Sequence, residues 1–116
     1  MRRTSLAVMA ALPLAAGACA SSGAADAAVT MTGAARFEPA GVTIPVGGTV
    51  VWHNDGVTRH TVTAIDEARA PTGAFDSGVV EGTGTFELTF DEPGAYTYTC
   101  TIHGGEMVGV VSVGGS

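Results

Sequence analysis

The chain has 116 residues, a length that suits one domain with a sandwich-sized core and no second domain with its own site. It carries 11 acidic and 5 basic residues, and all the basic ones are arginine. Because nucleic-acid binding needs clustered positive charge, this balance argues against that class of partner and suits a solvated surface or a basic partner.

A basic and then apolar N-terminus predicts export of the chain. Arg2 and Arg3 precede the apolar stretch 6–18, which resembles the hydrophobic core of a signal peptide and is too short to span a bilayer. We therefore expect an export signal at residues 1–20, a flexible tether of small residues at 21–28, and a folded domain at 29–116. The expected location is the periplasm or the outer face of the cell membrane.

Two cysteines are present, Cys19 in the expected export signal and Cys100 in the expected folded domain. Cys19 follows Ala16-Gly-Ala18 in a pattern that resembles a bacterial lipobox, in which the cysteine would be lipidated and tether the protein to a membrane. The alternative is cleavage after Ala20 at an Ala-x-Ala site, which discards Cys19. Under either cleavage Cys100 has no disulfide partner. A lone thiol in an oxidising compartment favours a thiolate held by a metal.

The residues beyond the tether predict an all-β fold. Short runs rich in valine, threonine and aromatic residues are separated by glycine, proline and aspartate. The expected strands lie at 29–32, 42–45, 49–54, 60–64, 83–90, 95–100 and 108–113. The polar segment 65–71 is expected to hold one helical turn before Pro71 ends it. No amphipathic helix of core length and no internal repeat is visible.

Side-chain alternation predicts that one face of each strand packs inward. The residues expected in the core are Phe37, Trp52, Val62, Ala64, Phe86, Leu88, Phe90, Tyr96, Tyr98, Val111 and Val113. His60, Cys100 and Met107 share the inward parity of their neighbours near strand ends. We therefore expect these three side chains to meet at one pole of a sandwich, whereas His53 is expected to face outward.

The last third of the chain concentrates soft metal donors. Cys100, His103 and Met107 offer a thiolate, an imidazole and a thioether on one loop, and His60 is the best candidate for one more donor. Such a set suits copper better than other common metals, because it accommodates Cu(I) and Cu(II) almost equally. Taken singly, His60 and Met107 are more often core residues and Cys100 an inert buried thiol. Their spacing and strand context together favour the metal site.

Several ordered stretches carry a resemblance to a known family. They are the loop Cys100-Thr-Ile-His103-Gly-Gly-Glu-Met107-Val-Gly109 and the segments 37–39, 46–54, 60–62, 75–78 and 90–96. Over residues 29–113 the chain resembles the cupredoxins, small blue-copper proteins of the plastocyanin and amicyanin type. The resemblance implies a Greek-key β-sandwich of about seven to eight strands. It also implies one type-1 copper ion held by His60, Cys100, His103 and Met107.

Three features depart from the family pattern, and one of them is that the proline common after the second histidine is missing after His103. The stretch 104–106 between His103 and Met107 is longer than in amicyanin-like loops, shorter than in plastocyanin-like loops and equal to the azurin spacing. The carboxylate of Glu106 is an alternative axial donor to the thioether of Met107, and we favour the thioether. Thr61 stands where plastocyanins and azurins have an asparagine that ties the two ligand loops together, and its hydroxyl is expected to do a similar job.

The resemblance implies an exported one-electron carrier rather than an enzyme. Electrons would enter and leave at the exposed edge of His103 during transient docking of a monomeric protein with redox protein partners. An oxidase or reductase needs a second copper centre or an open coordination position, which His53 cannot supply. The alternative is a copper-binding or copper-delivery protein that has the same fold and no dedicated electron-shuttle role.

Overall fold

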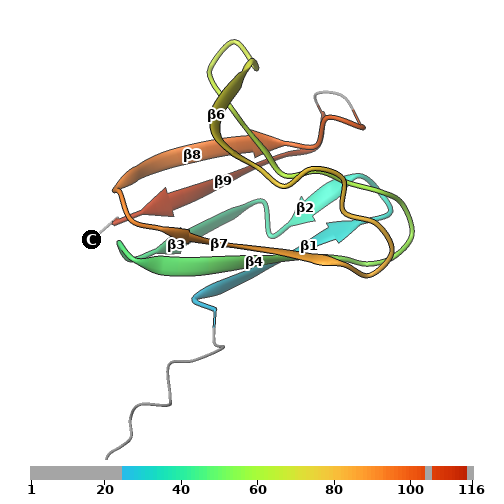
Figure 1. Cartoon of the computed structure of the whole chain (residues 1–116), viewed down its shortest axis with the longest axis horizontal. Coiled ribbons are helices and arrows are strands. Elements are labelled where there is room, and N and C mark those ends of the chain that lie inside the picture. The colour runs from blue at the N-terminus through green and yellow to red at the C-terminus, as the bar shows by residue number, and fades with distance from the viewer. Residues whose placement is uncertain (1–24, 104–105, 115–116) are drawn as a thin grey trace, which may run out of the picture.

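The computed structural model describes residues 25–103 and 106–114, and within them every named element is a β-strand. The expected export signal with Cys19, the first half of the expected tether (21–24), and Gly104 and Gly105 lie outside the described residues. Two sheets face each other as a sandwich (Figure 1). The described part of the chain holds no helix with the length and hydropathy needed to cross a membrane.

The sandwich is built from a four-stranded and a five-stranded sheet. The strands are β1 (Ala27–Thr32), β2 (Arg36–Glu38), β3 (Gly41–Ile44), β4 (Gly48–Asn54), β5 (Thr63–Ile65), β6 (Pro71–Asp76), β7 (Thr85–Phe90), β8 (Gly94–Thr99) and β9 (Val108–Val113). One sheet has the order β2-β1-β4-β7 and the other the order β3-β9-β8-β5-β6. β1 pairs with β4, and β3 with β9, in parallel; the other neighbours are antiparallel. This arrangement confirms the expected all-β sandwich.

All seven expected strands occur, and the sequence does not predict the other two, β2 and β6. β2 has three residues and β6 is almost wholly exposed, so neither shows a buried apolar run. Pro71 opens β6, a position where its missing N–H costs little because β6 is an edge strand. β5 begins at Thr63 rather than at His60, whose backbone instead forms an isolated bridge with Val80.

The helical turn expected at 65–71 is wrong. The carboxylate of Asp66 accepts the N–H groups of Ala68 and Ala70 at 2.8 and 2.9 Å. The N–H of Asp66 donates to the carbonyl of Ala70 at 2.9 Å, which closes a hairpin turn between β5 and β6. Aspartate competes for backbone N–H groups in this way, and the competition favours a turn over a helix.

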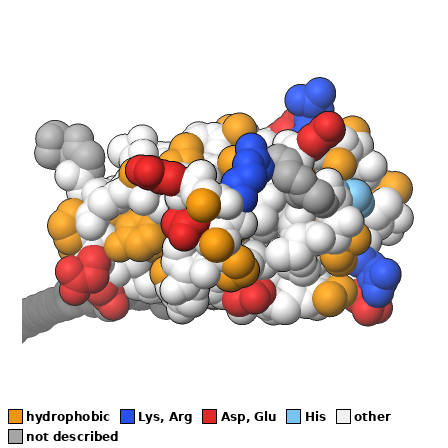
Figure 2. Space-filling view, turned by 90° about the horizontal axis from the view of Figure 1, so that it is seen from above, with side chains coloured by type: hydrophobic (Ala, Val, Ile, Leu, Met, Phe, Trp, Pro, Cys, Tyr) orange, Lys and Arg blue, Asp and Glu red, His pale blue; other side chains and the backbone are white. Residues whose placement is uncertain are grey.

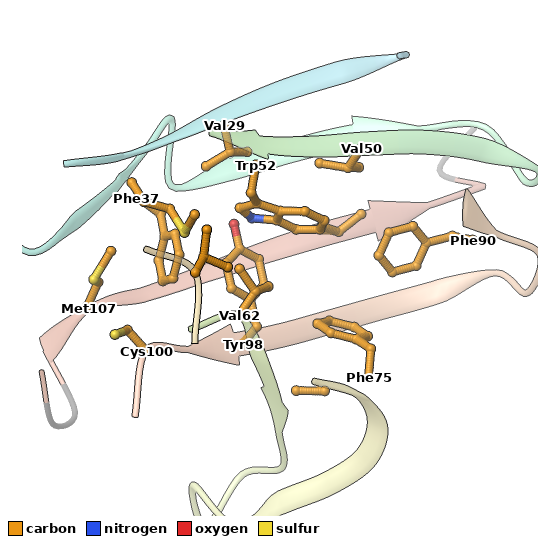
Figure 3. Close-up of a cluster of buried hydrophobic side chains, with 14 of the residues drawn as sticks. Val29, Phe37, Val50, Trp52, Val62, Phe75, Phe90, Tyr98, Cys100 and Met107 are labelled. Atoms are coloured by element: carbon orange, nitrogen blue, oxygen red, sulfur yellow. The ribbon is translucent and has the colours of Figure 1, made fainter. Parts of the chain in front are cut away.

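An aromatic cluster around Trp52 fills the space between the sheets (Figure 3). The rings of Tyr98, Phe86 and Phe75 lie 5.4, 5.5 and 6.4 Å from the ring of Trp52. Burial raises the pKa of Tyr98 to about 12, and the neighbouring Trp52 indole offsets this only in part. Each residue expected in the core is buried or packed against it, and His53 is exposed as expected.

Strand register brings four connecting segments to one pole of the sandwich. β1 and β4 end side by side, with Met31 opposite Asn54, and β8 ends where β9 begins, with Thr99 opposite Val108. The bridge between His60 and Val80 adds the segment before β7 to the same end. Rigid strands therefore hold, at one pole, the loops that carry the predicted metal donors. We call this end the ligand pole.

Candidate metal centre

Three of the four predicted donors meet at the ligand pole. One nitrogen of His60, one of His103 and the sulfur of Cys100 all lie within 4.8 Å of one another. The Sγ atom of Cys100 is 3.3 Å from Nδ1 of His103 and 3.8 Å from Nδ1 of His60. Metal bonds to imidazole and thiolate measure about 2.0 to 2.3 Å, so an ion among these atoms would need little movement of them.

Met107, the fourth predicted donor, is held on the same side of the core. Its side chain is wholly buried and lies beside Cys100 (Figure 3). The carbonyl of Met107 accepts the N–H of Cys100 at 3.2 Å and the hydroxyl of Thr99 at 2.8 Å. These two bonds close the loop from Cys100 to Met107, which we call the ligand loop, and keep its two ends side by side. Glu106 is exposed, so the sheltered donor on this side is the thioether and not the carboxylate.

The surroundings of His60 leave its Nδ1 atom available to bind a metal. Burial, helped by the nearby His103, lowers the pKa of His60 and favours the neutral ring. Its Nε2 atom lies 3.0 Å from the hydroxyl of Thr58. A neutral imidazole carries one N–H, so the tautomer with its proton on Nε2 leaves the lone pair of Nδ1 facing the sulfur. The role of Thr58 is not recognisable from the sequence, because nothing in its spacing marks a contact with His60.

Thr61 joins the two segments that carry the donors. Its backbone N–H donates to the Sγ atom of Cys100 at 3.3 Å. Its hydroxyl oxygen accepts the N–H of Thr101 at 2.9 Å and lies 3.2 Å from the Thr101 hydroxyl. The role expected for the Thr61 hydroxyl is therefore confirmed. The N–H aimed at sulfur also restricts the orientation of the Cys100 side chain.

Asn54 fixes the loop that leads to His60. Its amide nitrogen donates to the carbonyls of Thr58 and Val80 at 2.8 and 2.9 Å, and its amide oxygen accepts the N–H of Gly56 at 2.8 Å. The Asn54 side chain is buried, so water cannot easily replace these partners. Asn54 ends the expected strand 49–54, but the sequence does not reveal this role. The asparagine-aspartate-glycine run was the one signal that could have found it.

Asp55 clamps the same loop to the turn between β1 and β2. Its two carboxylate oxygens accept the N–H groups of Gly33 and Val57, each at 2.9 Å. These backbone hydrogen bonds, that of Val57 foremost, hold the pKa of Asp55 below its ordinary value of 3.8. The ionised carboxylate therefore stabilises the fold around the metal donors.

The donor set fits copper on the chemistry of its atoms. Two imidazole nitrogens and a buried thiolate, with a thioether beside the thiolate, combine borderline and soft ligands. Within the described ranges, this is the one group of at least three His, Cys, Asp or Glu side chains close enough to share an ion. His53 stands apart on the exposed face of β4.

The sequence is similar to known copper proteins. Residues 24–114 match the family described as copper binding proteins, plastocyanin/azurin family. Plastocyanin from Scenedesmus fuscus is 35% identical over 89 residues, which cover 71% of this chain and 90% of that protein. Halocyanin from Natronomonas pharaonis is 38% identical over 96 residues, which cover 76% of this chain and 56% of that protein.

Solved structures show the same likeness. A purple cupredoxin from Nitrosopumilus maritimus superposes with a TM-score of 0.69 at 34% identity, over 76% of this chain and 99% of that one. A reduced amicyanin mutant superposes with a TM-score of 0.65 at 30% identity, over 78% of this chain and 82% of that one. Both the sequence and the fold therefore align over most of the described residues.

The Asp55 clamp predicts a pH-dependent contribution to stability. Because the pKa of Asp55 is lower in the folded state, the clamp stabilises fully above about pH 5 and is lost as the pH falls through the region below 3.8. We expect Asp55→Asn to lower the free energy of unfolding of the metal-free domain more at pH 7 than at pH 3, as measured by urea denaturation. Asp91→Asn, at the opposite pole, is the control. An equal loss at both pH values would contradict the clamp.

Proposed function

This chain belongs to the plastocyanin/azurin family of copper-binding proteins, whose members are typically electron carriers, and we propose that it is an exported one-electron carrier with a type-1 copper site. The observation that carries the proposal is the meeting of His60 Nδ1, His103 Nδ1 and Cys100 Sγ at the ligand pole. In the proposal these atoms are the strong donors, and Met107 supplies the weak axial thioether.

Bound copper would supply a one-electron Cu(I)/Cu(II) couple, and the chain would supply a frame that both oxidation states tolerate. Thr61 holds the sulfur of Cys100 through its N–H, and Thr58 holds the far side of the His60 ring. The carbonyl of Met107 is tied to Cys100 within the ligand loop. Because these contacts restrict rotation of the donors, little rearrangement would accompany electron transfer, which favours speed.

The proposed path for electrons is the edge of His103. His60 and Cys100 are wholly buried, whereas His103 is partly exposed. Ile102 beside it is 41% exposed, and Val57 on the neighbouring loop is 69% exposed. Figure 2 shows apolar side chains around a histidine at this end of the molecule. Such a surface suits brief docking of the monomer with redox proteins through a small interface.

Export and a lipid tether form the remaining part of the proposal. β1 runs parallel to β4, with Ala27 opposite Val50 and Met31 opposite Asn54, so the described chain enters at the end far from the ligand pole. A lipid on Cys19 would therefore attach the domain through the end that does not carry His103.

We expect Cys19→Ala to abolish incorporation of labelled fatty acid and to release the protein from the membrane fraction. Fatty-acid labelling that persists in Cys19→Ala would refute the lipid site.

The copper site itself is tested by colour. We expect the wild-type domain to show an intense thiolate-to-copper absorption band after addition of Cu(II), which ascorbate bleaches and oxidation restores. Cys100→Ser should lose this band, because a hydroxyl cannot supply the sulfur ligand. His53→Ala, which removes the exposed histidine of β4, is the matched control and should keep the band. A blue Cys100→Ser variant would refute the ligand assignment, and copper lost to a chelator during cycling would favour copper delivery.

Docking at the ligand pole is tested by charge placement. Val57→Glu introduces a carboxylate into the apolar surface, and we expect it to slow electron self-exchange about tenfold or more, because like charges then meet as two copies approach. Val46→Glu is the matched control, since Val46 is 50% exposed at the opposite pole, beside Pro93 and Gly114. NMR line broadening of mixed oxidised and reduced protein measures the rate. Equal slowing by both variants would place docking elsewhere.

A further inference from the structure

A chain of hydroxyl groups connects the edge strand β6 with the loop that carries Cys100. Oδ1 of Asp76 lies 3.2 Å from Oγ1 of Thr63, which lies 3.1 Å from Oγ1 of Thr61. Oγ1 of Thr61 in turn accepts the N–H of Thr101 at 2.9 Å and lies 3.2 Å from the Thr101 hydroxyl. Thr61 and Thr63 are 4% and 2% exposed, whereas Asp76 is exposed.

The carboxylate determines the direction of every hydrogen bond in this chain. An ionised carboxylate only accepts, so the hydroxyl of Thr63 donates to Asp76. A hydroxyl has one proton, so the oxygen of Thr63 must then accept from Thr61. The proton of Thr61 is thereby committed, and its oxygen is left to accept both the N–H and the hydroxyl of Thr101. All donors therefore point toward β6.

We propose that Asp76, acting through Thr63, is a positioning residue for the metal centre. It orients the hydroxyl of Thr61 as a double acceptor for Thr101, the residue that follows Cys100. The backbone N–H of Thr61 donates to the sulfur of Cys100 at 3.3 Å. In this proposal the orientation of Thr61 controls the placement of the Cys100 sulfur and the hydrogen bond that this sulfur accepts from the Thr61 N–H. This inference rests on the proposed copper site and extends it to a residue on another strand.

The middle of the hydroxyl chain is buried, so water cannot easily take the place of a missing hydroxyl. If Thr63 lacked its hydroxyl, the proton of Thr61 would turn toward Thr101 or remain unpaired, since water has little access to a side chain that is 4% exposed. The exposed pair Thr49 and Thr89, whose hydroxyls are 2.8 Å apart on the other sheet, offers a comparison. That pair contacts none of the metal donors, so removing it tests the general cost of losing a hydroxyl.

Amide hydrogen exchange of the metal-free domain tests the role of the hydroxyl chain independently of copper. In Thr63→Val we expect the Thr101 N–H to exchange about fivefold faster, as the loss of one hydrogen bond implies. Thr63→Ser keeps the hydroxyl and should restore the wild-type rate, and Thr89→Val should not change it. Should Thr63→Val fail to fold, Asp76→Ala removes the exposed end of the hydroxyl chain, together with the hydrogen bond that Oδ1 accepts from the N–H of Gly78 at 2.9 Å, and should also accelerate exchange. Wild-type exchange in these variants would overturn the proposal.

The copper-loaded protein gives the second readout. We expect Thr63→Val and Asp76→Ala to keep the thiolate-to-copper band but to shift the reduction potential, measured by voltammetry, relative to Thr89→Val. Asp76→Asn retains an oxygen acceptor for Thr63 and should stay close to the wild type. Potentials that coincide in Thr63→Val and Thr89→Val would contradict the positioning role. If the wild type forms no such band, the proposed function fails, while the exchange rates still decide whether the hydroxyl chain acts.

Discussion

The hydrogen bond from the N–H of Thr61 to the sulfur of Cys100 joins two segments 39 residues apart, and the metal centre depends on that connection. Cys100 follows the last residue of β8 and opens the ligand loop, and His60 precedes Thr61 on the other donor segment. Without the contact, the two donor segments would still be joined by the hydrogen bonds between Thr61 and Thr101 and by the pairing of β5 with β8, but the sulfur itself would lose its link to the segment of His60. With it, the donor atoms are already within 4.8 Å of one another. A frame that is formed in advance leaves less ordering to be done when the ion binds.

The sandwich core makes this frame rigid. Trp52 on β4 packs edge-on against Tyr98 on β8, and Tyr98 lies two residues before Cys100 on the same face. Close-packed interiors resist displacement, so the aromatic cluster fixes the end of β8 independently of the loop contacts. The polar contacts of Asn54 and Thr58 then settle the more exposed loop around His60. Apolar packing thus sets the strand ends, and hydrogen bonds set the orientation of the donor side chains.

The sequence predicts the parts of this structure that follow from alternation. The inward parity of Cys100, His60 and Met107, and their meeting at one pole, need only strand periodicity and apolar neighbours. The contacts of Asn54, Thr58 and Asp76 were not predictable, because they join residues whose spacing has no period and whose partners are backbone groups or hydroxyls. The helical turn at 65–71 failed for a related reason: the Asp66 carboxylate captures backbone N–H groups, and local polarity alone does not reveal which ones. Edge strand β6 was missed because it buries little.

X-ray absorption at the copper edge of the loaded protein, in both oxidation states, tests the central claim most directly. If the chain holds His60, Cys100 and His103 in a frame that suits both states, the spectra will show copper bound by two imidazole nitrogens and one sulfur. Those ligand distances will change little on reduction. A copper ion without a sulfur ligand, or one that exchanges ligands or changes geometry on reduction, would contradict the account and separate this chain from the electron carriers of its family.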